Sequence, residues 1–238
     1  MSYGAETFAP QQGTLADRAS ADARGQFIVK TYAHLFGAIL AFIVLEAVLL
    51  SLPFAQAMTE TMLGGRYSWL IVLGAFMGMS WLANTWAHSS ASPSMQYMGL
   101  ALYVFAEAII FVPILYLASN FGGADVIPSA AIVTLVTFTG LTAIVFITRK
   151  NFSFLGPVLG VAGLAAMGLI VCSILFGFSL GIVFTAVMIA FAAGYILYTT
   201  SNIIHSYCIG QHVAASLALF AAVALLFWYI LQLFMSRD

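Results

Sequence analysis

Two carboxylic acids lie inside long apolar stretches, where an ionisable side chain is costly. Glu107 lies in the middle of the apolar run 100–117, and Pro113 follows it. Glu46 lies about two-thirds of the way along the run 31–52. An ionisable group in a bilayer costs roughly 2.5–3.5 kcal/mol on insertion scales, so each acid needs a partner or a function. Each is therefore either a neutral carboxyl bonded to another helix or part of an ion or proton path.

Weaker candidates for the same path are uncharged side chains that carry oxygen atoms. Asn84, Thr139 and Thr142 lie in neighbouring apolar runs. Threonine hydroxyls in helices commonly bond back to their own backbone, so a structural role is the competing interpretation. Calcium prefers about six to eight oxygen ligands. Together with the two acids, these residues predict at most a weak, partly hydrated calcium site, or a proton path.

Motifs of enzymes and of bound cofactors are absent from the sequence. It contains no H-E-x-x-H, no G-x-S-x-G and no phosphate-binding glycine loop. Ser201 has no base placed beside it by sequence, and the spacing of His205, Cys208 and His212 fits no familiar zinc pattern. We therefore expect no catalytic residues, no metal site and no cofactor.

The composition indicates that membrane-embedded elements must position these residues. Of 238 residues, 6% are charged and 63% are hydrophobic, and the mean hydropathy is +1.07. A soluble protein of this size has about 25% charged residues, so most of this chain must lie in a lipid bilayer. The net charge of -1 and the lack of a basic stripe exclude a nucleic-acid partner.

The sequence predicts an all-α polytopic membrane protein with seven transmembrane helices. Lipid cannot satisfy backbone hydrogen bonds, so apolar runs long enough to cross a hydrocarbon core of about 30 Å must be helical. The break near Gly177 is the weakest, which leaves six to eight spans open. Glycine pairs four residues apart, such as Gly74 and Gly78 or Gly156 and Gly160, predict close helix packing. The expected spans are 31–52, 68–88, 95–118, 126–148, 155–175, 179–201 and 213–234.

The first thirty residues differ from the rest because they are polar and charged. We expect residues 1–30 to form a mobile cytoplasmic tail and residues 31–238 to form one membrane domain. Basic residues favour one side of the predicted topology, five against two. The positive-inside rule then places the N-terminus in the cytoplasm and the C-terminus outside.

Several motifs, in order, resemble the Bax-inhibitor family of membrane proteins. Residues 27–32 (FIVKTY) are similar to the start of that family's first helix. Residues 138–142 (FTGLT), the basic turn 148–150 (TRK) and residues 152–156 (FSFLG) are similar to its fourth helix, turn and fifth helix. Residues 196–204 (ILYTTSNII) resemble its sixth helix. The resemblance covers about residues 27–234.

The resemblance implies a seven-helix bundle with the last helix near its centre. It implies a bacterial inner membrane, or alternatively the endoplasmic reticulum or Golgi. In leak-type family members two aspartates share a proton and gate the pore. Those positions fall on Thr199 and Ala222 here, and neither side chain titrates. The family's gate therefore cannot be carried over to this chain.

Two functions remain open, and neither is enzymatic. The first is a calcium or proton leak that uses Glu107 and Glu46 instead of the aspartate pair. The second, which the resemblance also implies, is a modulator or substrate adaptor of an FtsH-type membrane AAA+ protease without transport activity. In that case residues 1–30 would be the handle offered to the protease, because a flexible tail of this length can reach a neighbouring complex.

Overall fold

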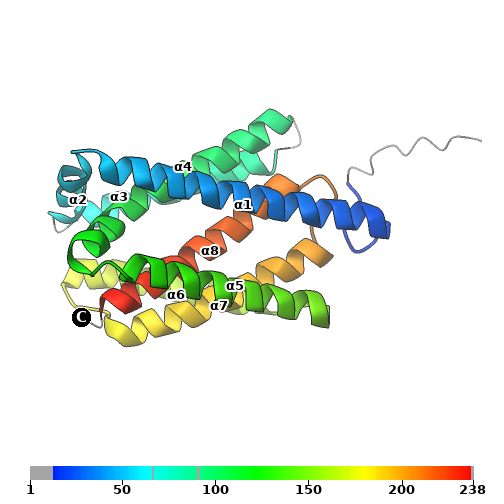
Figure 1. The fold of residues 1–238 in the computed structure, drawn as a ribbon. Helices are drawn as coiled ribbons and strands as arrows, with labels where there is room; N and C mark the ends of the chain where they lie inside the picture. The colour runs from blue at the N-terminus through cyan, green and yellow to red at the C-terminus, as the bar shows by residue number, and fades with distance from the viewer. Residues whose placement is uncertain (1–12, 66, 90–91, 237–238) are drawn as a thin grey trace, which may run out of the picture.

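The computed structural model describes residues 13–65, 67–89 and 92–236, which fold into an all-helical bundle (Figure 1). Seven helices in this part of the chain are long and apolar enough to cross a membrane, as predicted. A short additional helix, α2, lies between the first two spans and was not predicted. The helices are α1 (Ala21–Ser51), α2 (Ala55–Leu63), α3 (Ser68–Ala87), α4 (Pro93–Phe121), α5 (Val126–Thr148), α6 (Leu155–Phe176), α7 (Gly181–His205) and α8 (His212–Met235).

The break between α6 and α7, the least certain in the sequence, is a real chain reversal. Gly177 and Gly181 adopt positive φ angles of 76° and 70°. Glycine reaches this left-handed region without steric cost, and a helix commonly ends on such a residue. The two glycines therefore separate α6 from α7, although the residues between them are apolar.

The expected boundary at residue 30 is wrong, because α1 begins ten residues earlier. The Ser20 hydroxyl accepts a hydrogen bond from the Ala23 N–H and caps the helix start. Leu15 forms a β-bridge with Cys208, and Ala16 is fully buried. The segment 13–20 is thus packed against the loop between α7 and α8. The remainder of the expected tail, residues 1–12, lies outside the described residues.

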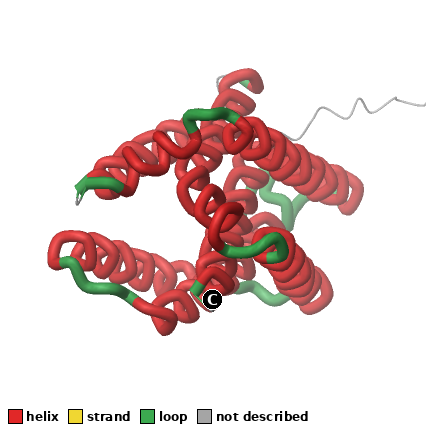
Figure 2. The backbone as a smooth tube through the Cα atoms, turned by 60° about the vertical axis from the view of Figure 1, so that its left-hand side comes forward, coloured by secondary structure: helices red, strands yellow, loops and turns green. Residues whose placement is uncertain are grey.

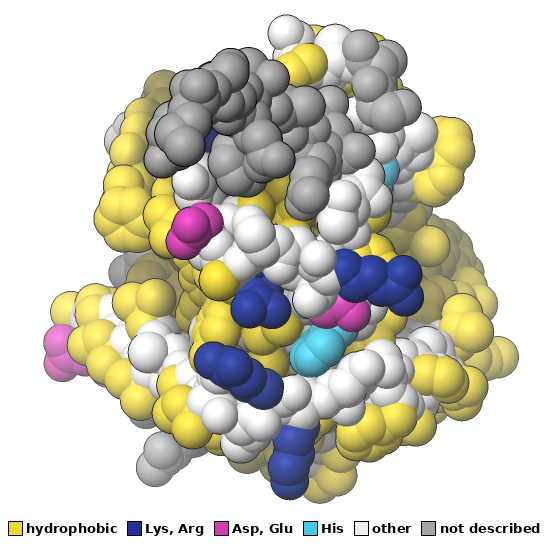
Figure 3. Space-filling model, turned by 90° about the vertical axis from the view of Figure 1, so that its right-hand side faces the viewer, with side chains coloured by type: hydrophobic (Ala, Val, Ile, Leu, Met, Phe, Trp, Pro, Cys, Tyr) yellow, Lys and Arg dark blue, Asp and Glu magenta, His cyan; other side chains and the backbone are white. Residues whose placement is uncertain are grey.

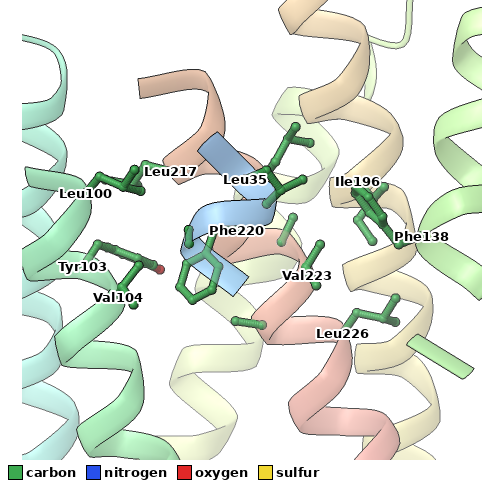
Figure 4. Close-up of a cluster of buried hydrophobic side chains, with 14 of the residues drawn as sticks. Leu35, Leu100, Tyr103, Val104, Phe138, Ile196, Leu217, Phe220, Val223 and Leu226 are labelled. Carbon is green, nitrogen blue, oxygen red and sulfur yellow. The ribbon is translucent and has the colours of Figure 1, made fainter. Parts of the chain in front are cut away.

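Helix α8 occupies the centre of the bundle, with α1, α3 and α4 on one side and α5 and α7 on the other (Figures 1 and 2). Helices α4 and α8 are also the most buried spans. Side chains of α8 such as Phe220 and Leu226 meet Tyr103 on α4, Leu35 on α1 and Ile196 on α7 (Figure 4). An all-round apolar helix of this kind is expected at the core of a bundle.

The predicted close packing of the glycine pairs is largely wrong. A Cβ atom added at Gly74, Gly78 or Gly160 would meet no atom within 4 Å, whereas one at Gly156 would contact the Tyr198 ring. The close helix approach is made instead at Gly99 on α4. Its added Cβ would lie 2.5 Å from the Ala83 carbonyl oxygen of α3. Spacing in the sequence could not identify the glycine that faces a neighbouring backbone.

Many large apolar side chains lie exposed on the outside of the bundle. Ile71, Val136 and Leu164, for example, are each more than 60% exposed. A soluble protein rarely leaves such extensive apolar surface in water. Helix α6 is the extreme case, because Ala166 is its one buried residue within the described chain. These surfaces face lipid, and the chain is an integral membrane protein.

Candidate functional site

Glu107 projects from α4 into the core. Its side chain is 6% exposed, and the Tyr103 hydroxyl, one turn earlier on the same helix, is its hydrogen-bond neighbour. Tyr103 also lies beside Ser80 of α3 and packs edge-on against Phe220 of α8, with ring centroids 6.2 Å apart. The Glu107 carboxyl is therefore bonded to a phenol that itself packs against α3 and α8.

Glu46 projects from α1 toward the same core. Its side chain is 5% exposed, and both carboxyl oxygens are buried without a hydrogen-bond partner among the described residues. Burying a polar group without a partner costs several kcal/mol, roughly 2–7, and a buried charge costs more. Glu46 is therefore expected to be protonated, or to be hydrated by internal water, in the resting protein.

An aromatic cluster lies in the core where α1, α4 and α8 meet. We use this name for Phe42, Phe111, Phe220 and Phe227, whose rings contact one another through Phe42 and Phe111. The Phe42 and Phe111 centroids are 5.1 Å apart, and Phe111 is 1% exposed. The cluster therefore packs the three helices together in the buried core.

The relative direction of α1 and α4 follows from residue pairs that join them. His34 hydrogen-bonds Tyr97, and further along both helices Phe42 contacts Phe111, so α1 and α4 run in the same direction. Glu107 precedes Phe111 by one turn, whereas Glu46 follows Phe42 by one turn. The two acids therefore project from parallel helices, each one turn from the Phe42–Phe111 contact.

The uncharged candidates do not gather around these acids. The Asn84 amide donates to the Ser80 carbonyl of its own helix, 2.9 Å away. Thr139 is exposed on the surface of α5, so we leave it out of the proposed path. Thr142 is half-buried, and its hydroxyl is directed inward. The structure therefore brings together no oxygen-rich calcium shell among the described candidate residues.

Thr142 belongs instead to a hydroxyl cluster, which consists of Tyr32 on α1, Thr142 on α5 and Thr200 on α7. Tyr32 interacts with both threonines, and all three hydroxyl oxygens are buried without hydrogen bonds of good geometry. The sequence analysis missed Tyr32 and Thr200. Each is a single polar residue in an apolar helix, and only the packing of three helices places them together.

The two positions that carry aspartates in leak-type relatives are both buried. Thr199 is 3% exposed and interacts with the Tyr195 hydroxyl one turn earlier on α7, whereas Ala222 is fully buried on α8. No charged side chain occupies either position. A proton shared between carboxylates is therefore impossible at these two residues.

Ser201 has a structural contact rather than a nucleophile's environment. Its hydroxyl accepts a hydrogen bond from the Phe152 N–H, 2.9 Å away, and so ties the α5–α6 loop to α7. The His205 Nδ1 lies 2.9 Å from the Ser201 carbonyl oxygen and 3.4 Å from the hydroxyl. Because Nδ1 donates its proton to that carbonyl, it is not a base for the hydroxyl.

We expected no metal site at His205, Cys208 and His212, which lie around the α7–α8 loop. His212 packs on His34 of α1, with ring centroids 4.9 Å apart, while His205 contacts Ser201. Within the described residues, no three His, Cys, Asp or Glu side chains group closely enough to hold a metal ion.

Comparison with known proteins yields one family and several relatives. Residues 24–238 match the family described as inhibitor of apoptosis-promoting Bax1. The chain is 30% identical over 172 residues to an uncharacterised protein of Pseudomonas aeruginosa, covering 69% of this chain and 72% of that protein.

Two further relatives carry functional names. The chain is 30% identical over 174 residues to Bax inhibitor 1 of Schizosaccharomyces pombe, covering 70% of this chain and 62% of that protein. It is 35% identical over 132 residues to the modulator of FtsH protease of Escherichia coli, covering 53% and 58%. The alignments thus span less than two thirds of the length of these two relatives.

Proposed function

The chain belongs to the Bax-inhibitor family, and from that premise we propose that it is a proton leak of a bacterial inner membrane in which Glu107 and Glu46 replace the aspartate pair. The observation that carries this proposal is the burial of two acids in the apolar core, one beside a phenol hydroxyl and one without a hydrogen-bond partner among the described residues. Two such groups can take up and release protons in turn, one on α4 and one on α1. The apolar surroundings of both acids would keep the resting flux low.

A proton suits this arrangement better than calcium. Calcium needs about six to eight oxygens in one shell, whereas the acids project from different helices and Glu46 has no hydrogen-bond partner among the described residues. A proton needs one acceptor at a time and can pass through hydroxyl groups and internal water. Tyr103, beside Glu107, and internal water near the unpaired Glu46 oxygens would supply such steps.

The proposed orientation follows from the basic residues. Arg18, Arg24, Lys30, Arg149 and Lys150 all belong to segments at one end of the bundle, called the basic end here (Figure 3). The described acids Glu60 and Asp125 belong to segments at the opposite end. By the positive-inside rule, we place the basic end and the N-terminus in the cytoplasm.

The test is proton flux into sealed vesicles that contain the purified full-length chain. With a membrane potential imposed by a potassium gradient and valinomycin, an internal pH dye should report flux above that of protein-free vesicles. A calcium dye in parallel vesicles should report none. Proton flux equal to that of protein-free vesicles would refute the leak, and calcium flux without proton flux would replace the proton with calcium.

A second candidate function rests on the relative named as a modulator of FtsH protease. In this case the bundle would bind beside a membrane protease and offer residues 1–12 to it. Deleting residues 2–12 leaves the packed segment from residue 13 onward, including the Leu15–Cys208 bridge, in place. The cellular half-life of the deleted protein should then rise several-fold in cells that contain the protease. An unchanged half-life would count against this function.

A further inference from the structure

A cavity of about 140 Å³ opens at the basic end among α1, α5 and α7, beyond the two acids of the proposed leak. Its lining consists of Arg24 and Ile28 from α1, Phe146 and Arg149 from the end of α5, and Ile204 from α7. Two arginines therefore line one cavity together with three apolar residues. We propose that this cavity binds the phosphate group of an anionic phospholipid.

The two arginines are free to bind an external anion. Within the described residues, neither Arg24 nor Arg149 forms an ion pair or a side-chain hydrogen bond. Arginine offers several donors in a planar fork, and paired donors on a phosphate are among the strongest hydrogen bonds that proteins make. Two such side chains on one cavity match the charge and the geometry of a phosphodiester.

The backbone of Arg149 gives an independent reason to assign a role to its side chain. Arg149 has a φ angle of 51°, and it is the one non-glycine residue with positive φ in the described part of the chain. It occupies the C-cap of α5, where glycine would adopt the same conformation without steric cost. Arginine at this strained position places a cationic residue in the cavity lining, which a glycine could not do.

The inner wall of the cavity is continuous with the hydroxyl cluster. Ile28, Phe146 and Ile204 each lie one helical turn from a member of that cluster, namely Tyr32, Thr142 and Thr200. The Tyr32 and Phe146 ring centroids are 5.8 Å apart, which links the two layers. The unpaired hydroxyls thus lie beneath the apolar wall, where they can bond a water molecule or a polar headgroup atom.

Exposed apolar side chains beside the cavity favour a lipid over a soluble phosphate. Val29, next to Ile28, is 68% exposed, and Ile147, next to Phe146, is 82% exposed. These surfaces face the hydrocarbon or its boundary, so acyl chains can pack there while the phosphate reaches the arginines. A basic pocket between membrane helices on the cytoplasmic side is a recurrent form of anionic-lipid site.

The experiment is native mass spectrometry of the detergent-purified full-length chain with an equimolar mixture of phosphatidylglycerol and phosphatidylcholine. The wild type should retain phosphatidylglycerol about tenfold more than phosphatidylcholine, because phosphatidylcholine has the same phosphate but its choline cation is repelled by the two arginines. The double variant Arg24→Gln/Arg149→Gly should retain the two lipids equally. Its fold should survive, because glycine relieves the left-handed conformation at residue 149.

The matched control is Arg18→Gln/Lys150→Gln, which removes the same charge from the same end but leaves the cavity lining intact. It should keep the preference for phosphatidylglycerol. Equal losses in both double variants, or no preference in the wild type, would overturn the proposal. Inorganic phosphate is added in a third arm. If it displaces phosphatidylglycerol at matched concentration, the site is for a soluble phosphate and the lipid assignment is overturned.

Discussion

Replacing Glu107 with glutamine is expected to lower proton flux in the vesicle assay by about tenfold or more. Glutamine has nearly the same shape as a protonated glutamate, so it can fill the same buried space. It cannot bind and release a proton, however. If protons pass by way of the Glu107 carboxyl, the amide interrupts the path while the bundle remains folded.

Two further variants test whether the loss of flux is specific to the Glu107 carboxyl. Glu107→Asp keeps a titratable carboxyl on a shorter side chain and should restore part of the flux. Glu60→Gln removes an exposed acid from α2, outside the core, and should leave the flux unchanged. The leak mechanism proposed here fails if Glu107→Gln conducts like the wild type while both proteins have the same helical content by circular dichroism.

Replacing Gly99 with alanine should strongly destabilise the bundle. The added Cβ would lie 2.5 Å from the Ala83 carbonyl oxygen and 2.6 Å from the Ala87 backbone nitrogen. Both atoms belong to the backbone of α3, so no flexible side chain can move aside. Overpacking of this kind costs about 1–3 kcal/mol and sometimes more, and the backbone contact places Gly99 at the upper end of that range.

The measurement is the thermal unfolding midpoint of the detergent-solubilised protein, for which we expect a clear decrease. The matched control is Gly74→Ala on α3, where the new methyl group meets no atom within 4 Å. Alanine is the better helix former, so the control should be as stable as the wild type or more stable. Equal midpoints for the two variants would contradict the close approach of α3 and α4.

How much of the fold could be predicted is clearest at the helix boundaries. The span predicted at 126–148 coincides with α5, because an uninterrupted apolar run ends there at Arg149. The start of α1 was missed by ten residues, since residues 21–30 include Asp22, Arg24 and Lys30 and contain no long apolar run. The short α2 was missed for the same reason.

The residues of the candidate site could likewise be predicted from the sequence only in part. Glu107 and Glu46 could be identified from the sequence because a carboxyl in an apolar run is conspicuous, and both are buried. The aromatic cluster near them could not be identified, because Phe42 and Phe111 are ordinary apolar residues 69 positions apart whose meeting depends on how α1 packs on α4. Thr139 is exposed and Thr142 half-buried, a difference that likewise depends on how α5 packs on its neighbours.

The sequence alone indicated that the chain lies in a bilayer, that it is helical and which family it resembles, since these depend on composition, run length and ordered local motifs. It located seven apolar runs but left six to eight spans open. The tertiary structure decided which residues meet. It placed α8 at the centre, buried the two acids near the Phe42–Phe111 contact and brought Arg24 to the same cavity as Arg149. The physical reason is that an apolar helix is compatible with lipid on any face, so its sequence carries little information about which face turns inward.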